Sequence, residues 1–278
     1  MTELPGRELP DRETLDREYD AAKSVPNVDN YIARYQAESK IARNKMSPIR
    51  DIQYGPTEDE RLDLFRTEDC TGPLALFFHG GYWRRLDKDD FSYIAQGLLP
   101  LGISFASVNY SLAPAASLRT IVEQCRRAVK WMRNNNDRLE INPARMSVFG
   151  HSAGGHLAAM CGVDIPVHAV ASISGLHELG QVQQSFANEW LNLDEREAQA
   201  LSPVKYAPAR RFLVYTTAGS KESEDGFKSQ GRALVDAWKP YGCKAEYEDS
   251  PGDDHFTIMM RLMNPNDRLT QKIAELAR

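Results

Sequence analysis

The sequence has few of the features that mark membrane proteins or nucleic-acid-binding proteins. No apolar stretch approaches the roughly 18 residues of a transmembrane helix. The N-terminus is acidic and interrupted by proline, where a signal peptide would be basic and then apolar. The net charge is −5 and no dense Lys/Arg cluster is present, so we expect neither nucleic acid nor a membrane surface as a partner.

Cysteine is also scarce, and the four cysteines form no C-x-x-C pair: Cys70, Cys125, Cys161 and Cys243. Such wide spacing predicts reduced thiols in a cytoplasmic protein, with no metal cluster. The chain shows neither an internal repeat nor a low-complexity tract. A small-molecule substrate is therefore the expected partner.

Alternating strand and helix patterns predict the fold class. The expected strands include an early hairpin at 50–54 and 61–65, followed by 74–78, 103–108, a run ending before Ser152, 167–173, 212–217 and 244–248. The expected helices lie at 118–132, 153–163, 226–238 and 268–277. This alternation is typical of an α/β fold, in which helices cover both faces of a mostly parallel central sheet.

The sequence also predicts the domain organisation. Residues 1–48 should form an N-terminal arm and a helix that packs on a catalytic domain of residues 49–278. The first 20 residues are expected to be a loosely held arm, and the helix should start near Val28, behind a capping residue at Asp29. Residues 176–208 interrupt the alternation where a lid is expected. The pattern leaves open whether the helix covers the lid or the partner subunit of a homodimer.

One serine stands out as a candidate nucleophile. Residues 150–154 read Gly-His-Ser-Ala-Gly, which matches G-x-S-x-G, and they follow a short apolar run. A serine on a sharp turn between strand and helix presents its hydroxyl, and the flanking glycines permit the turn. The N-terminus of the following helix would stabilise an anion beside Ser152.

A second glycine motif supports this interpretation. Residues 79–83 read His-Gly-Gly-Tyr-Trp and follow the strand at 74–78. We expect the main-chain N–H groups of Gly81, Tyr82 and Ala153 to form an oxyanion hole. Either motif alone could be an ordinary glycine turn, but both occur in the order that acyl-transfer enzymes require.

His255 is the candidate general base among six histidines. His79 is better suited to holding the glycine loop, His151 and His156 flank the serine too rigidly, and His168 lies in an apolar run. His255 lies in a loop after the last strand and downstream of the serine, as the order serine, acid, histidine requires.

The acid is less sharply defined. It should follow the strand at 212–217, where Glu222, Glu224 and Asp225 are candidates. We favour Glu222, which stands three residues after Gly219, over Asp225 and then Glu224. A carboxylate there would orient the imidazole and stabilise its protonated form.

These motifs resemble the α/β-hydrolases, and within them the arylformamidase (kynurenine formamidase) and esterase-like group. The resemblance rests on residues 79–83, 109–114, 150–156 and the His255-Phe256 pair, and it covers most of residues 50–260. It implies a serine hydrolase that cleaves an aryl formamide such as N-formylkynurenine, without a metal or organic cofactor. The alternatives are a broad carboxylesterase and a non-catalytic binding module.

Aromatic side chains near the expected mouth suit an aryl leaving group, whereas a formyl group needs almost no acyl pocket. We therefore expect the substrate to contact Tyr82, Trp83, His151 and Trp190. Phe186, Tyr31 and Tyr35 are further candidates.

Overall fold

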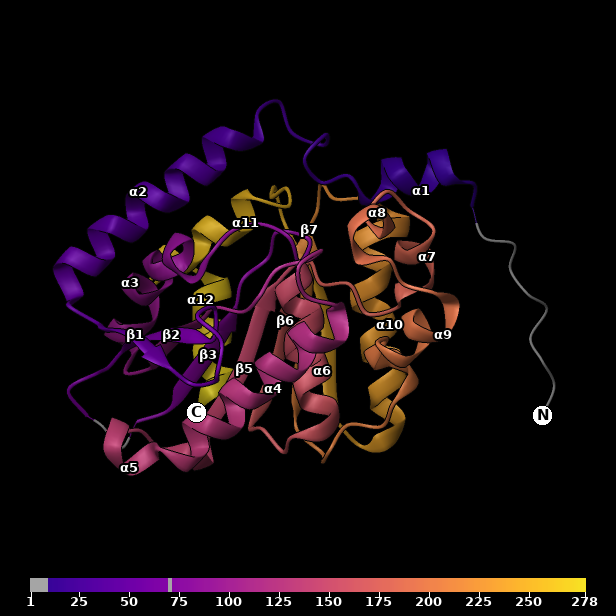
Figure 1. Ribbon diagram of the computed structural model, residues 1–278. Coiled ribbons are helices and arrows are strands. Elements are labelled where there is room, and N and C mark those ends of the chain that lie inside the picture. Colours follow the sequence, from indigo (N-terminus) through magenta and orange to yellow (C-terminus); the bar gives the residue numbers. More distant parts are fainter. Residues whose placement is uncertain (1–9, 70–71) are drawn as a thin grey trace.

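The protein is built around one eight-stranded sheet (Figure 1). The structure is a computed structural model that describes residues 10–69 and 72–278, so Cys70 lies outside the described residues. The strand order is β1-β2-β4-β3-β5-β6-β7-β8. The strands are β1 (Ile49–Gln53), β2 (Arg61–Phe65), β3 (Leu74–Phe78), β4 (Ser104–Val108), β5 (Met146–His151), β6 (Ala169–Ile173), β7 (Leu213–Gly219) and β8 (Lys244–Ser250).

The pairing of the strands follows from their sequences. β1 and β2 form the expected antiparallel hairpin, β2 also runs antiparallel to β4, and the other neighbours are parallel. Every residue of the central strands β3, β4, β5 and β6 is buried, as expected for parallel strands covered on both faces. The edge strand β8 carries more polar residues and is only partly covered.

Helices cover both faces of the sheet. In Figure 1, α4 and α6 lie in front of the central strands and α12 lies behind them. α6 packs on β5 and β6, whereas α12 contacts β3, β5 and β6. The helices are α1 (Arg12–Tyr19), α2 (Val28–Met46), α3 (Ala95–Leu98), α4 (Leu118–Asn134), α5 (Asn136–Leu139), α6 (Ala153–Asp164), α7 (Leu179–Gln183), α8 (Asn188–Leu191), α9 (Glu195–Ala200), α10 (Ser229–Trp238), α11 (Thr257–Met260) and α12 (Arg268–Ala277).

The N-terminal segment differs from its prediction. The expected loose arm is wrong for residues 12–19, which form α1 and bury Leu15 and Tyr19 against the rest of the protein. α2 begins at Val28, but its cap is Asn27 rather than Asp29, because the Asn27 side chain accepts a hydrogen bond from the Asp29 N–H at 3.0 Å.

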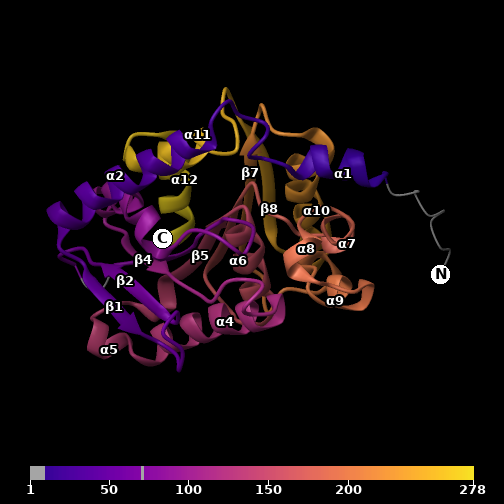
Figure 2. The same cartoon turned by 45° about the horizontal axis from the view of Figure 1, so that its top comes forward.

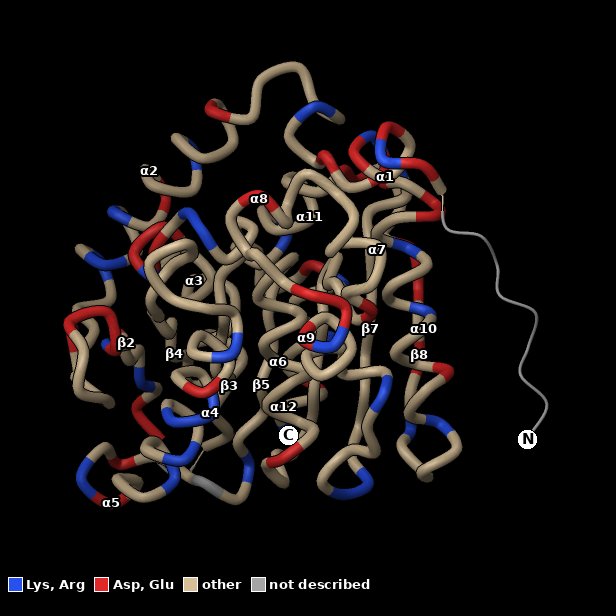
Figure 3. Tube along the Cα trace, turned by 45° about the vertical axis from the view of Figure 1, so that its right-hand side comes forward, with Lys and Arg blue, Asp and Glu red and all other residues tan. Residues whose placement is uncertain are grey.

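The surface helices and the distribution of charge describe the outside of the molecule. None of the helices in the described ranges is long and apolar enough to cross a membrane. Over the same part of the chain, basic and acidic residues are interspersed along the surface elements (Figure 3).

Two buried histidines, His156 on α6 and His177 after β6, should make the free energy of unfolding depend on pH. Burial lowers the pKa of His156 to about 4, and burial together with nearby His156 lowers the pKa of His177 to about 3. An unfolded histidine titrates near about pH 6.5. Below that pH the unfolded state binds more protons than the folded state, so the free energy of unfolding falls as pH decreases toward 4.

Urea unfolding at pH 7.5 and pH 5.0 checks this expectation. Replacing His177 with Gln removes one depressed titration and should reduce the loss of stability between the two pH values by about 2 kcal/mol. The control is His168→Gln, because His168 is only partly buried and should change the loss less. An identical loss in wild type and His177→Gln would contradict the assignment.

Candidate active site

Five loops converge at one edge of the sheet because the carboxyl ends of parallel strands meet there. The residues that follow these strand ends are the glycine loop 79–82 after β3, Ser152 after β5, Ser174 after β6, Glu222 after β7 and His255 after β8. Segments spread over nearly 180 positions of the chain thus come together in space.

Ser152 sits on a strained turn. Its φ is 54° and its ψ is −122°, a conformation that L-residues rarely adopt. The turn is held because the Ser152 N–H donates to the Ile173 carbonyl oxygen at 2.8 Å and the Ser152 carbonyl accepts from Gly155 at 2.9 Å. A Cβ on Gly154 would overlap the Phe78 carbonyl, so only glycine allows α6 to start this close to β3.

The glycine loop lies directly against the serine. A Cβ on Gly80 would lie 2.9 Å from the His151 carbonyl oxygen and 3.2 Å from the Ser152 Cβ, which shows how closely the two segments approach. Gly81 and Tyr82 have φ of 104° and 52°. Within residues 10–69 and 72–278, no acceptor takes a hydrogen bond from the main-chain N–H of Gly81 or Tyr82. These donors are available to a ligand, as is the first turn of α6 at Ala153.

His79 is fully buried at the start of this loop and does not line the cavity that contains Ser152 and His255. Its ring stacks on Tyr110 with a centroid distance of 4.2 Å, and the Tyr110 hydroxyl donates to the His79 carbonyl oxygen at 2.6 Å. Burial lowers the pKa of His79, which keeps the ring neutral.

The imidazole of His255 is oriented by Glu222. Nδ1 of His255 donates to Glu222 Oε2 at 2.7 Å, and both side chains are buried. Glu222 Oε1 accepts from the Ser174 hydroxyl at 2.5 Å and from the Gly219 N–H at 2.6 Å. Three donors therefore fix the carboxylate, whereas Asp225 is exposed on the π-helical turn that follows.

We expect Glu222→Gln to lower kcat/KM by about 10² to 10⁴-fold, because the amide no longer stabilises the protonated ring. Asp225→Asn is the matched control and should stay within about twofold of wild type, since rim charges away from the reacting atoms contribute little. Steady-state kinetics on any hydrolysed substrate distinguishes the two. A larger loss in Asp225→Asn would overturn the assignment of Glu222.

Ser152 and His255 line the same cavity but do not form a hydrogen bond with each other in the described structure. Because Nδ1 binds Glu222, Nε2 is the ring nitrogen left to accept a proton. The hydrogen bond between a serine hydroxyl and the histidine that accepts its proton is often long without substrate and shortens when substrate binds. His151 borders the pair: its ring centroid lies 4.6 Å from that of His255, and its Nε2 donates to the His255 carbonyl oxygen at 2.8 Å.

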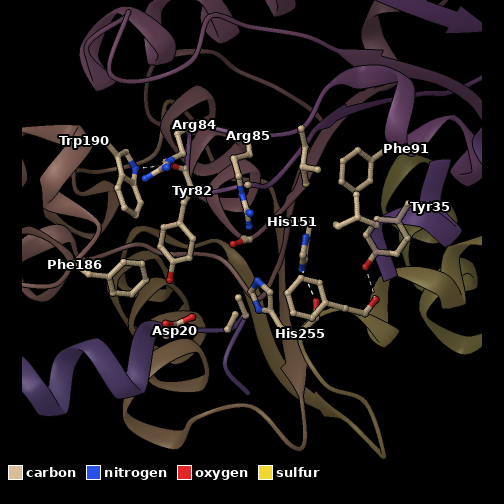
Figure 4. Close-up of a pocket in the computed structure, with 17 residues that line it drawn as sticks. Asp20, Tyr35, Tyr82, Arg84, Arg85, Phe91, His151, Phe186, Trp190 and His255 are labelled. Atoms are coloured by element: carbon tan, nitrogen blue, oxygen red, sulfur yellow. Dashed lines mark hydrogen bonds between the residues drawn. The ribbon is translucent and has the colours of Figure 1, made fainter. Parts of the chain in front are cut away.

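The cavity has a volume of about 260 Å³ and a mostly apolar wall. Figure 4 shows Tyr82, Phe186 and Trp190 on one side and Tyr35 and Phe91 on the other. Trp190 comes from α8 in the expected lid region, and its indole N–H donates to the Tyr82 carbonyl oxygen at 2.9 Å. The lid region and the glycine loop thus share one wall.

Trp83 does not line this cavity, so its prediction as a substrate contact is wrong. With φ of 56° in the same turn as Tyr82, it directs its ring into the core, where it is fully buried and packs edge-on against His156 at 5.3 Å. Tyr82 therefore lines the cavity, whereas its neighbour Trp83 packs in the core.

The N-terminal segment also contributes to the site, through Tyr35, which the sequence indicated, and through residues 20–22, which it did not. Asp20, Ala21 and Ala22 line the cavity together with Ser152. Figure 2 shows the connection between α1 and α2 passing over the strand ends. α2 then covers the loop that carries His255, because the Tyr35 hydroxyl donates to the Phe256 carbonyl oxygen at 2.6 Å.

The remaining histidines do not line the cavity that contains Ser152 and His255. Nε2 of His156 donates to the Leu201 carbonyl oxygen at 2.7 Å, His177 bonds to the Ser172 hydroxyl at 2.9 Å, and His168 precedes β6. Ser174 is a site residue that sequence reasoning missed. The available signal was a polar residue directly after β6, at the same sheet edge.

Comparison with known proteins agrees with this architecture. The BD-FAE family model matches residues 62–186, which include the glycine loop and Ser152. The chain is 26% identical to a kynurenine formamidase from Danio rerio over 95% of this chain and 96% of that one. It is 27% identical to the esterase LipQ of Mycobacterium tuberculosis over 84% of this chain and 60% of that one.

Solved structures show the same fold. A protein from Silicibacter sp. TM1040 superposes with a TM-score of 0.84 at 29% identity, covering 93% of this chain and 98% of that one. An esterase from Pyrobaculum calidifontis superposes with a TM-score of 0.69 at 19% identity, covering 96% of each chain. The chain has the α/β-hydrolase fold that its motifs predict, and its kynurenine formamidase and esterase homologues support a hydrolase of the α/β family.

Proposed function

We propose that this α/β-family hydrolase uses Ser152 as its nucleophile and cleaves an aryl formamide such as N-formylkynurenine. The observation that carries the proposal is the buried hydrogen bond between Glu222 and His255, whose imidazole lines the same cavity as Ser152. A carboxylate, an imidazole and a serine arranged in this order perform acyl transfer on many unrelated substrates.

The proposed mechanism has two steps. His255 takes the proton of Ser152 while the serine oxygen attacks the formyl carbon, and the N–H groups of Gly81, Tyr82 and Ala153 stabilise the oxyanion. Each of these donors contributes roughly 3 kcal/mol to the transition state. His255 then protonates the leaving aryl amine, and water releases formate from the serine by the same route.

The cavity supports an aryl leaving group. Tyr82, Phe186 and Trp190 form an aromatic cluster with centroid distances of 5.6 to 6.1 Å, which suits a flat ring. A formyl group needs almost no acyl pocket, so most of the small volume of about 260 Å³ is left for the aryl side. The kynurenine formamidase homologue supports the same substrate class.

A broad carboxylesterase is the second candidate, because the chain also has esterase homologues. A side-by-side assay separates the two. An arylformamidase should hydrolyse N-formylkynurenine with a higher kcat/KM than p-nitrophenyl acetate, and an esterase should show the reverse order. Failure to hydrolyse either substrate, together with no labelling by a fluorophosphonate, would indicate a non-catalytic binding protein and contradict both.

A further inference from the structure

The cavity carries charged residues that the hydrolytic mechanism does not use. Arg84 and Arg85 follow the glycine loop, and Asp20 comes from the N-terminal segment, yet all three line the cavity. None of them is needed for attack, proton transfer or oxyanion binding. Charged groups beside a largely apolar cavity fix the orientation of a ligand and select its chemistry.

The two arginines have different surroundings. The guanidinium of Arg84 lies 4.3 Å from the ring centroid of Trp190, which gives it a cation–π partner. Arg85 has no acidic side chain within 4 Å among residues 10–69 and 72–278. Figure 4 shows its guanidinium directed into the cavity on the side of His151. Arg85 is therefore the cationic group available to an anionic ligand.

The position of Arg85 is tied to the oxyanion loop. The main-chain N–H groups of Arg84 and Arg85 both donate to the Gly81 carbonyl oxygen at 3.0 Å. Close packing of Gly81 against the Arg85 carbonyl holds the same turn. An anion bound by Arg85 would thus be held at a fixed distance from the group that Gly81 and Tyr82 bind.

Asp20 supplies the opposite charge. It lies across the cavity from Arg85 in Figure 4, and its side chain is 15% exposed. Its carboxylate pairs with Lys23 at 3.0 Å, but the Lys23 side chain is 84% exposed and its ion pair is readily exchanged with solvent. An ammonium group on a ligand can therefore bind Asp20 from the cavity side.

We infer that Arg85 and Asp20 are specificity-determining residues that bind the end of the substrate remote from the scissile amide, with Arg85 binding an α-amino-acid carboxylate and Asp20 facing its ammonium group. The inference rests on the proposed function, because it assigns the distal end of that aryl substrate. A planar guanidinium binds a carboxylate through two parallel hydrogen bonds, which makes Arg85 a specificity-determining residue.

The kinetic test compares N-formylkynurenine with 2′-formamidoacetophenone, which keeps the ring, ketone and formamide but lacks the amino-acid group. Wild type should prefer the former in kcat/KM. Arg85→Gln should reduce that preference by about 10 to 100-fold while changing kcat/KM for the smaller substrate by less than about threefold. Asp20→Asn should reduce it by about 3 to 10-fold. The matched control is Arg119→Gln, an exposed arginine on α4 away from the cavity.

A binding measurement separates this inference from the proposed function. Calorimetry with Ser152→Ala and kynurenine should give a Kd at least about tenfold tighter than with 2-aminoacetophenone, and adding Arg85→Gln should remove that difference. An unchanged difference, or equal loss of activity on both formamides in Arg85→Gln, would overturn the role of Arg85. If wild type cleaves neither formamide, the proposed function fails while the calorimetric result still decides the inference.

Discussion

Replacing Ser152 with alanine should lower kcat/KM by about 10⁴ to 10⁶-fold and abolish labelling by a fluorophosphonate. The loss is large because the hydroxyl forms the covalent bond, and no neighbouring group can take its place. Alanine fits the strained turn as serine does, since Ser152 uses its main chain rather than its side chain to hold the elbow. The thermal midpoint should therefore stay within about 2 °C of wild type.

The matched control for this variant is Ser117→Ala. Ser117 is exposed and caps α4 by accepting a hydrogen bond from the Thr120 N–H at 3.2 Å. Its loss should cost about 1 kcal/mol of stability but leave kcat/KM unchanged. The two variants thus separate stability from catalysis. Residual activity above about one per cent in Ser152→Ala, in a preparation free of wild type, would exclude this serine as the nucleophile.

The parts of the site that could be predicted from the sequence lie next to strand ends. Ser152 and the glycine loop each follow an apolar run, and the carboxyl ends of parallel strands share an edge, so their convergence follows from the fold. The position of Glu222 follows from the register of β7 and the tight turn after Gly219, where the Glu222 N–H donates to the Gly219 carbonyl oxygen at 2.9 Å. Local patterns were sufficient at these positions.

Other parts depend on tertiary contacts that no local pattern encodes. Tyr82 and Trp83 are adjacent aromatics with the same left-handed backbone, but only the fold decides that one faces the cavity and the other the core. Asp20 belongs to the site only because α1 docks against α7 in the lid region, where the Tyr19 hydroxyl donates to the Gln181 side chain at 2.6 Å. That hydrogen bond joins two residues that lie 162 positions apart in the chain.

Replacing His255 should have an effect of similar size to that of Ser152, and two substitutions distinguish its chemical role from its structural one. His255→Gln keeps an N–H that can donate to Glu222 but provides no basic nitrogen. His255→Ala leaves the buried carboxylate without that donor. Both variants should lower kcat/KM by about 10⁴-fold or more, because neither can accept the serine proton.

Their stabilities should differ. Glu222 keeps its bonds from Ser174 and Gly219 in both variants, but only His255→Ala leaves Oε2 buried without a partner. That change should cost about 1 to 3 kcal/mol in urea unfolding, whereas His255→Gln should remain closer to wild type. A His255→Gln variant that retains more than about a tenth of wild-type kcat/KM would show that the proton goes elsewhere, and His151, whose ring lies beside that of His255, would then be the group to replace.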